Sequence, residues 1–373
     1  MEQHGRGRAG RRERAAGQPG SPLAALFLVA LLQAGAAWAA DPSAHTTSAP
    51  AAAHAAADLD AAWRQRFARP QGPPPAPADN PMTPEKVALG RRLFADARLS
   101  GDGRRSCASC HDPQRSFTDG RARARSVSGP PLRRNTPDLW NLAWARTFFW
   151  DGRAPSIEAQ AAMPIAEPGE MGGDWPTILR RLEADAGLRG EFRAAFPAEP
   201  APTRAAVLAA LASYVRSLVS PRTRFDAWVE GDRSALTSRE LSGFRIFTGK
   251  GGCVLCHVGW RFTDDRFHDI GLPGSDAGRG AVAGGTPGLA AFKTPGLREA
   301  AHTAPYMHDG SLPTLAAVVR HYAGGLRARP SLAVHVDPKL RLDARERADL
   351  VAFLRTLSSD KGPARTRQAG PRR

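Results

Sequence analysis

Two short motifs in this sequence have residue types and a spacing that can do chemistry. In each, two cysteines stand three positions apart and a histidine follows at once. Thiols at this spacing bond covalently to the edge of a c-type haem, and the adjacent imidazole reaches the iron. The first motif contains Cys107, Cys110 and His111, and the second contains Cys253, Cys256 and His257. These motifs use all four cysteines, so no thiol is left for a disulfide.

Each motif follows a segment that is predicted to be a helix. Thr83 can cap a helix with Pro84 at its first position, and the pattern continues at helical spacing to Phe94. Thr237 and Glu240 form a capping box ahead of the second motif. The order of helix, loop and Cys-x-x-Cys-His therefore occurs twice, which indicates an internal repeat.

Two more helices are expected to close the two halves of the chain. The segment from Thr203 to Val219 carries a wide apolar face, and the segment from Asp343 to Leu357 begins with a capping pair and carries an apolar stripe. No alternating pattern indicates a substantial sheet. We therefore predict an all-α, mainly helical protein with two cytochrome c-like domains, each with one covalently bound c-type haem.

Changes in amino-acid composition along the chain indicate further segment boundaries. A basic N-terminal region precedes an apolar run that ends at Trp38, and Ala37 and Ala39 are spaced as in a signal-peptidase site. The following residues are rich in Ala and Pro, with one amphipathic patch from Trp63 to Phe67. We predict a signal peptide over 1–39, a disordered linker over 40–79, an N-terminal domain over 80–225, a C-terminal domain over 226–358 and a basic disordered tail over 359–373.

The N-terminal signal predicts export to the periplasm by the Sec route, because c-type haem is attached after the unfolded chain is exported. A twin-arginine signal at Arg11-Arg12 and an uncleaved anchor are the alternatives. The apolar run is too short for a good membrane span, so none is expected in the mature chain. The net charge of +16 lies partly in the signal region and the tail, which argues against a nucleic-acid partner. A basic exported protein would instead attract an acidic partner.

Longer motifs carry a family resemblance. The segment from Arg134 to Gly173 reads RNTPDLWNLAWARTFFWDGRAPSIEAQAAMPIAEPGEMGG, and FKTPGLRE and TAPYMHDG follow the second haem motif. In this order, the motifs resemble those of the bacterial di-haem cytochrome c peroxidase family and its MauG branch over residues 80–358. The resemblance implies that the first haem reacts with peroxide and the second transfers electrons.

The resemblance also implies roles for three residues near the first haem. Trp150 matches the family's tryptophan between the two haems, where an oxidisable indole can relay charge. Gln160 and Glu170 match residues of the distal pocket, where a carboxyl group can move the protons of peroxide. Glu167 is a neighbouring alternative to Glu170.

The axial ligands of the two irons distinguish the branches of this family. No histidine or methionine lies between His111 and Arg134, so the switch histidine of reductively activated peroxidases is missing. This absence favours a first haem that is five-coordinate or closed by water, as in MauG. The candidates for the sixth ligand of the second iron are Met307, His308, His321 and Tyr322. Tyr322 lies at helical spacing from Leu315 and Val319, and at the position where MauG carries its axial tyrosine, so we predict it as the ligand.

The resemblance further implies a calcium ion between the haems. Asn135, Thr303 and Pro305 match its ligands, one side-chain amide oxygen and two backbone carbonyls. The alternative for Asn135 is a turn residue before Pro137. The expected cofactors are therefore two c-type haems and one Ca²⁺.

The predicted function is that of a periplasmic di-haem oxidoreductase. It would use hydrogen peroxide to form a high-valent di-haem state and would oxidise a partner protein, as MauG does. The first alternative is a cytochrome c peroxidase that takes electrons from a small cytochrome or cupredoxin and has a neutral axial ligand such as Met307. The second is a non-catalytic di-haem electron-transfer cytochrome, which needs no distal glutamate. The expected partners are hydrogen peroxide and a periplasmic redox protein or protein substrate.

Overall fold

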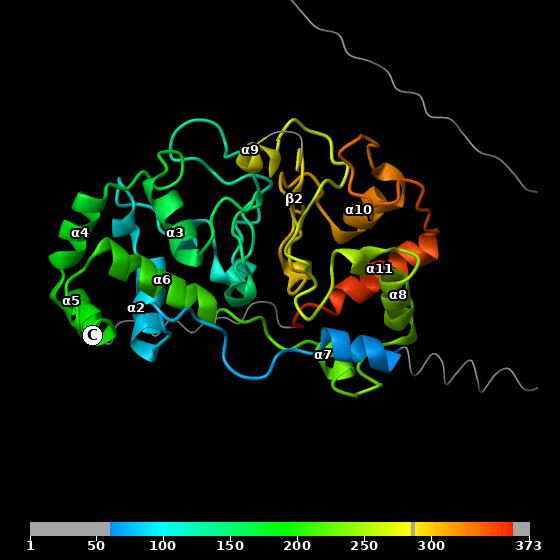
Figure 1. The fold of residues 1–373 in the computed structure, drawn as a ribbon, viewed down its shortest axis with the longest axis horizontal. Helices are drawn as coiled ribbons and strands as arrows, with labels where there is room; N and C mark the ends of the chain where they lie inside the picture. The colour runs from blue at the N-terminus through cyan, green and yellow to red at the C-terminus, as the bar shows by residue number, and fades with distance from the viewer. Residues whose placement is uncertain (1–59, 285–287, 361–373) are drawn as a thin grey trace, which may run out of the picture. The chain divides into compact units, whose positions relative to one another are not determined.

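A computed structural model describes residues 60–284 and 288–360, and these residues are mainly helical, as predicted (Figure 1). Residues 60–67 are helical. The other helices and strands are α2 (Pro84–Phe94), α3 (Ile157–Ala166), α4 (Trp175–Glu183), α5 (Ala186–Ala195), α6 (Arg204–Ser217), α7 (Arg224–Val229), α8 (Ser238–Thr248), β1 (Phe267–His268), α9 (Gly280–Ala283), β2 (Phe292–Lys293), α10 (Leu315–Arg320) and α11 (Ala344–Arg355). The predicted signal peptide and the end of the basic tail lie outside the described residues.

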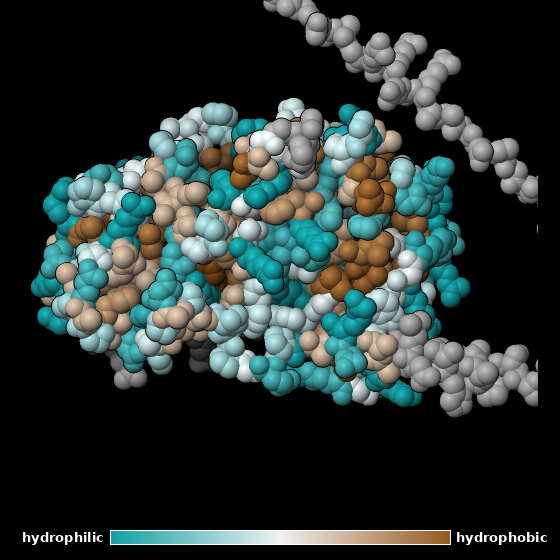
Figure 2. Space-filling model, viewed as in Figure 1, coloured by the Kyte–Doolittle hydropathy of each residue, from teal (hydrophilic) through white to brown (hydrophobic). Residues whose placement is uncertain are grey.

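Within these two ranges, no helix has the length and apolar content that a membrane crossing requires. On the face in Figure 2, polar residues predominate and hydrophobic residues form separate groups between them.

The helices that precede the two haem motifs begin at the capping residues that the sequence predicted. The Thr83 hydroxyl accepts a hydrogen bond from the Lys86 backbone at 3.2 Å, which caps α2. In α8, the Thr237 backbone N–H donates to the Glu240 carboxylate at 2.8 Å, and the Thr237 hydroxyl completes the box. These contacts satisfy N–H groups that a helix start leaves without an internal partner.

A glycine allows close helix crossing in each half of the chain. α2 lies against α6, and α8 lies against α11 (Figure 1). A Cβ atom added to Gly90 would lie 1.9 Å from the Ala210 carbonyl oxygen, and one added to Gly243 would lie 2.0 Å from that of Asp349. Only glycine fits at such contacts. The two halves thus use the same helix crossing ahead of their haem motifs, which agrees with the predicted repeat.

The apolar side chains form two separate core clusters. The first contains residues between Leu89 and Leu218, and the second contains Phe67 and residues between Phe225 and Leu357. The sequence boundary between the clusters lies close to the predicted domain boundary. Phe225, the last residue of the predicted N-terminal domain, packs in the second cluster.

Part of the predicted disordered linker is ordered, so that prediction was wrong for residues 60–69. Phe67 is completely buried and its ring stacks on Phe262 at a centroid distance of 4.6 Å. Arg69 forms an ion pair with Asp226 at 3.0 Å. The composition of this region is dominated by Ala and Pro, but the amphipathic patch that ends at Phe67 supplies enough apolar surface to pack against the C-terminal core.

Replacing Phe67 with Ala is expected to destabilise the haem-loaded protein by about 3–5 kcal/mol, because it removes a fully buried ring. Urea unfolding of the two proteins, followed by circular dichroism, measures this change. Val334→Ala is the control, since Val334 is 91% exposed, and it should leave the unfolding curve unchanged. An unfolding midpoint for Phe67→Ala equal to that of the wild type would contradict the packing described above.

Candidate active site

The histidines of the two haem motifs are held in the same way. His111 Nδ1 lies 2.9 Å from the Phe117 carbonyl oxygen, and His257 Nδ1 lies 2.8 Å from that of Phe262. A carbonyl at this distance accepts the Nδ1 proton and leaves Nε2 free to bind a metal. Burial lowers the pKa of both imidazoles, which favours the neutral form that an iron ligand requires.

The four cysteines form no disulfide and are placed for attachment to a cofactor. Short 3₁₀ turns over Cys107–Ser109 and Cys253–Leu255 hold the two motifs. Burial raises the pKa of Cys107 and that of Cys253 to about 12. Such thiols are protonated at neutral pH and are poor nucleophiles in the folded chain.

A cavity of about 620 Å³ lies beside the first haem motif. Both motif cysteines and His111 line it, together with residues from α3 and from the loop around Phe148 to Arg153. The opposite wall comes from the C-terminal half, between Arg261 and Arg298. The cavity is therefore built by both halves of the chain.

Two polar atoms on this cavity test whether a haem fits there. Trp140 Nε1 and Thr147 Oγ1 are buried, line the cavity and have no hydrogen-bond partner among the described residues. Buried polar atoms without a partner are rare in folded proteins. A bound molecule with polar groups, such as the propionates of a haem attached at Cys107 and Cys110, would satisfy them. The cavity thus fits the cofactor that the motif predicts.

Both residues predicted for the distal pocket line this cavity. Gln160 lies on α3, and Glu170 lies in the turn after it. Burial raises the pKa of Glu170, and the positive charge of Arg153 partly offsets this rise. The charge of Glu170 also contributes, after burial and Asp119, to the raised pKa of Cys110, so the carboxyl group lies near the first haem motif. Glu170 is half-buried, whereas Glu167 lines the cavity but is exposed.

Trp150 lies where the two halves meet. Its ring lines the cavity, and its Nε1 donates a hydrogen bond to the Asn135 carbonyl oxygen at 3.0 Å. Its own carbonyl oxygen accepts from the Lys293 backbone at 2.7 Å. These contacts hold the indole between the first haem site and a strand of the C-terminal half.

The candidate ligands for the second iron have different surroundings. The His321 ring bonds to the Ile270 carbonyl oxygen at 2.8 Å, and the His308 ring stacks on Phe292 at a centroid distance of 3.5 Å. Met307 has a left-handed backbone, with φ of 76°. The pKa of Tyr322 is raised by burial and then by the thiols of Cys253 and Cys256. The Tyr322 side chain therefore lies within electrostatic range of the second haem motif.

Among the residues predicted to bind calcium, Asn135 forms hydrogen bonds to two other segments of the chain. The Asn135 amide nitrogen donates to the Arg121 carbonyl at 2.7 Å, which turns its side-chain oxygen away from that carbonyl. The Asn135 backbone N–H donates to the His308 carbonyl at 2.7 Å, so Asn135 touches the TAPYMHDG motif. Thr303 follows a short turn over Ala300–His302, and Pro305 belongs to the same motif.

Two charged residues on the cavity were not assigned a role from the sequence. Burial raises the pKa of Asp138 to about 7, and its carboxylate accepts from the Trp140 backbone at 2.9 Å. Lys293 donates to the Thr147 carbonyl at 2.6 Å and pairs with Asp265 at 3.0 Å. Both lie inside the family motifs quoted above, but motif membership alone does not show that a side chain faces a cavity.

Comparison with known proteins identifies the family. Residues 84–234 match the family described as di-haem cytochrome c peroxidase. The methylamine utilization protein MauG of Methylorubrum extorquens is 47% identical over 348 residues, which cover 91% of this chain and 96% of that protein. The chain belongs to the di-haem cytochrome c peroxidase and MauG family.

Two further relatives agree with this assignment. A cytochrome-c peroxidase of Denitromonas iodatirespirans is 38% identical over 325 residues, which cover 78% of this chain and 85% of that protein. The crystal structure of a MauG-like protein associated with microbial copper homeostasis is 35% identical, with a TM-score of 0.74, and covers 81% of this chain and 97% of its own. The family implies two haems, and the chain is a di-haem peroxidase-type oxidoreductase.

Proposed function

We propose that this di-haem enzyme acts in the periplasm, uses hydrogen peroxide to reach a high-valent di-haem state and oxidises a partner protein, as a MauG-like enzyme. The observation that carries this proposal is that Cys253 and Cys256 act electrostatically on the Tyr322 side chain, which therefore lies within range of the second haem motif. The identity of 47% with a protein named MauG supports the same branch.

Bound haem supplies an iron that activates peroxide and stores oxidising equivalents. His111 would hold the first iron from one side, and the cavity lies beside it. On the cavity, the Glu170 carboxylate would take the proton of the bound peroxide and return it to the departing oxygen. The Gln160 amide would orient the same molecule by hydrogen bonding. Burial of Glu170 raises its pKa, which makes it a stronger base and a readier proton donor near neutral pH.

Trp150 would pass the second oxidising equivalent between the two haem sites. Its ring lines the cavity, and its backbone is tied to β2 of the C-terminal half. The hydrogen bond from Nε1 to the Asn135 carbonyl would stabilise an oxidised indole, because it places a negative dipole beside the developing positive charge.

Tyr322 and His257 would together hold the second iron. A phenolate is anionic, so it favours the oxidised iron and lowers the potential of that haem. A low potential at the site held by His257 and Tyr322 would favour storage of an oxidising equivalent over the uptake of electrons from a small cytochrome. This preference distinguishes an enzyme that oxidises a protein substrate from one that only removes peroxide.

The second candidate function is peroxide reduction with electrons from a small cytochrome or cupredoxin. The 38% identity with a cytochrome-c peroxidase favours it, and it requires a neutral axial ligand such as Met307. The electrostatic effect of Cys253 and Cys256 on Tyr322, which puts its side chain within range of the second motif, argues against it. The remaining alternative is an electron-transfer cytochrome. This function gives no role to Glu170, which lines the cavity.

We also propose a calcium ion between the haems, held by Asn135, Thr303 and Pro305. The amide oxygen and the two carbonyls are hard donors that suit Ca²⁺. An acidic partner is proposed for the protein substrate, because exposed arginines without an ion pair among the described residues flank the first haem motif in the sequence. These arginines are Arg104, Arg121, Arg123, Arg125 and Arg133.

The decisive experiment is a peroxide titration of the fully oxidised enzyme, followed by optical and electron paramagnetic resonance spectra. The proposal expects both haems to change without prior reduction. It also expects one high-spin and one low-spin ferric haem before peroxide is added. Two low-spin haems, one of which becomes high-spin only after partial reduction, would establish the reductively activated peroxidase instead.

Replacing Trp150 with Phe is expected to leave the initial reaction with peroxide intact and to remove the spectral change at the second haem. The reason is that a phenyl ring is much harder to oxidise than an indole. Rapid-mixing spectroscopy of both haems measures the two steps separately. Trp175→Phe is the control, since Trp175 lies on α4, away from the residues that line the cavity. A second-haem change at the wild-type rate would remove Trp150 from the transfer route.

A further inference from the structure

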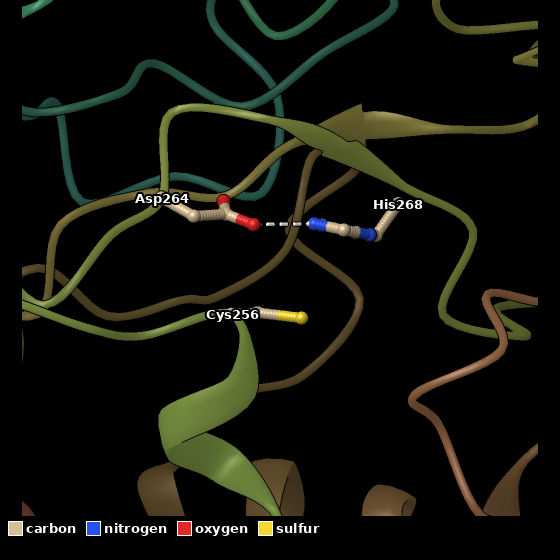
Figure 3. Close-up of side chains that lie close together, drawn as sticks. All are labelled: Cys256, Asp264 and His268. Atoms are coloured by element: carbon tan, nitrogen blue, oxygen red, sulfur yellow. Dashed lines mark hydrogen bonds and ion pairs between the residues drawn. The ribbon is translucent and has the colours of Figure 1, made fainter.

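A carboxylate and an imidazole meet at the second haem motif. His268 Nε2 lies 2.7 Å from Asp264 Oδ2, and both side chains lie within 4.8 Å of the Cys256 sulfur (Figure 3). His268 belongs to β1, which pairs with β2, so its backbone is fixed. The Asp264 and His268 side chains are only 13% and 15% exposed. This arrangement is thus a built feature of the fold.

Three such groups could hold a metal ion, but the chemistry of Cys256 argues against that use. The haem motif converts its sulfur into a thioether, which no longer carries the negative charge of a thiolate ligand. One carboxylate and one imidazole remain, and they already bond to each other. A role other than metal binding must therefore explain why they lie beside Cys256.

The two groups form an ion pair. Hydrogen bonding to Asp264 raises the pKa of His268 above that of an ordinary imidazole. Hydrogen bonds from His268 and neighbouring donors lower the pKa of Asp264 to about 2, although burial opposes this. The adjacent carboxylate of Asp265 pairs with Arg261 and Lys293, so it is compensated elsewhere. The pair next to Cys256 is consequently neutral as a whole.

We propose that the Asp264–His268 pair tunes the reduction potential of the second haem. Because the Cys256 sulfur bonds to the porphyrin edge, groups that touch this sulfur lie beside that edge. A single charge there acts on the iron through a partly buried region, where electrostatic interactions are stronger than in water. A positive charge disfavours the oxidised haem and a negative charge favours it. The pair keeps both charges close to the haem while their effects largely cancel.

This inference does not depend on which protein is oxidised. It requires only that a haem is attached at Cys256, as the family implies. It adds a pair of opposite charges beside the second haem, for which Tyr322 is the proposed ligand. Asp264 and His268 are therefore positioning residues and do not touch peroxide.

The test is the midpoint potential of the second haem in four holoenzyme variants at about pH 5, where an imidazole is protonated even without its partner. Asp264→Asn leaves a positive charge and should raise the potential. His268→Gln leaves a negative charge and should lower it. The double variant removes both charges and should return the potential toward the wild-type value. His335→Gln, at an exposed histidine, should change nothing.

The potential of the first haem serves as the internal reference and should stay unchanged in every variant. Shifts in the same direction, shifts that accumulate in the double variant, or no shift at all would overturn the proposal. If His268→Gln fails to retain haem, Asp264→Asn and Asp264→Glu carry the test. The Asn variant should raise the potential and the Glu variant, which keeps the charge, should not. The peroxide titration described above tests the proposed function separately.

Discussion

The Glu170→Gln enzyme is expected to react with hydrogen peroxide about 10²–10⁴-fold more slowly than the wild type, the range by which a positioned acid-base group accelerates a reaction. Glutamine keeps the size of the side chain but cannot take up or return a proton. Both haems should remain attached, because Glu170 lines the cavity without belonging to either haem motif. Stopped-flow absorption of the oxidised enzyme mixed with peroxide measures the second-order rate constant.

The pH dependence of the same rate gives a second measurement. Burial raises the pKa of Glu170, so its carboxylate is lost at a higher pH than that of an ordinary glutamate. The group acts first as a base, and it must be ionised to do so. The wild-type rate constant should therefore fall as the pH falls through this raised pKa, and the Gln variant should lack that step.

Glu167→Gln is the matched control for both measurements. Glu167 lines the same cavity and lies three positions earlier, but it is exposed. Its replacement should leave the rate constant at high pH close to that of the wild type, and should move the pH step slightly lower, because the charge of Glu167 raises the pKa of Glu170. A large loss in Glu167→Gln, with a normal rate in Glu170→Gln, would exchange the roles of the two carboxylates.

Replacing Tyr322 with Met is expected to abolish oxidation of the partner protein and to raise the potential of the second haem by roughly 0.1 V or more, since axial ligation and its surroundings set haem potentials over about 0.8 V. A thioether is neutral, and it favours the reduced iron more than a phenolate does. The second haem would then accept electrons more readily from a small cytochrome. Spectroelectrochemical titration measures the potential, and an assay with peroxide and a reduced small cytochrome measures the gained activity.

Tyr306→Phe provides the control for this change. Tyr306 lies in the same half of the chain, but its hydroxyl donates to the Ala300 carbonyl at 2.8 Å. Its removal should leave the potential of the second haem unchanged. If Tyr322→Met and Tyr322→Phe both keep the wild-type low-spin spectrum, Tyr322 is not the ligand, and Met307, His308 and His321 become the candidates again.

Local signals predicted several elements well. The predicted caps at Thr83, Thr237 and Asp343 lie at the starts of α2, α8 and α11. A cap depends on one side chain and the N–H groups two or three residues later, so it can be recognised within a short window. The helices α3, α4, α5 and α7 were not predicted. Pro164 within α3 illustrates the difficulty, because an internal proline normally argues against a helix.

Long-range contacts decided the features that the local patterns missed. The Ala- and Pro-rich composition around Phe67 favoured disorder, but its ring meets Phe262, almost two hundred residues later. Whether an apolar patch finds a partner depends on the folded chain, and composition does not contain that information. Asp138 and Lys293 were likewise visible in the sequence, but only the fold places them on one cavity.

The sequence by itself determined the cofactor chemistry, since covalent haem attachment needs two thiols and a histidine within five residues. The family motifs also carried the candidate distal and axial residues. Only the tertiary structure decided which of these side chains meet. It brings both halves of the chain around the first haem motif and puts Tyr322 within electrostatic range of Cys253 and Cys256. It also pairs Asp264 with His268 beside Cys256 of the second motif. Charges and ligands act over a few ångströms, and these distances are set by packing between segments that are far apart in the chain.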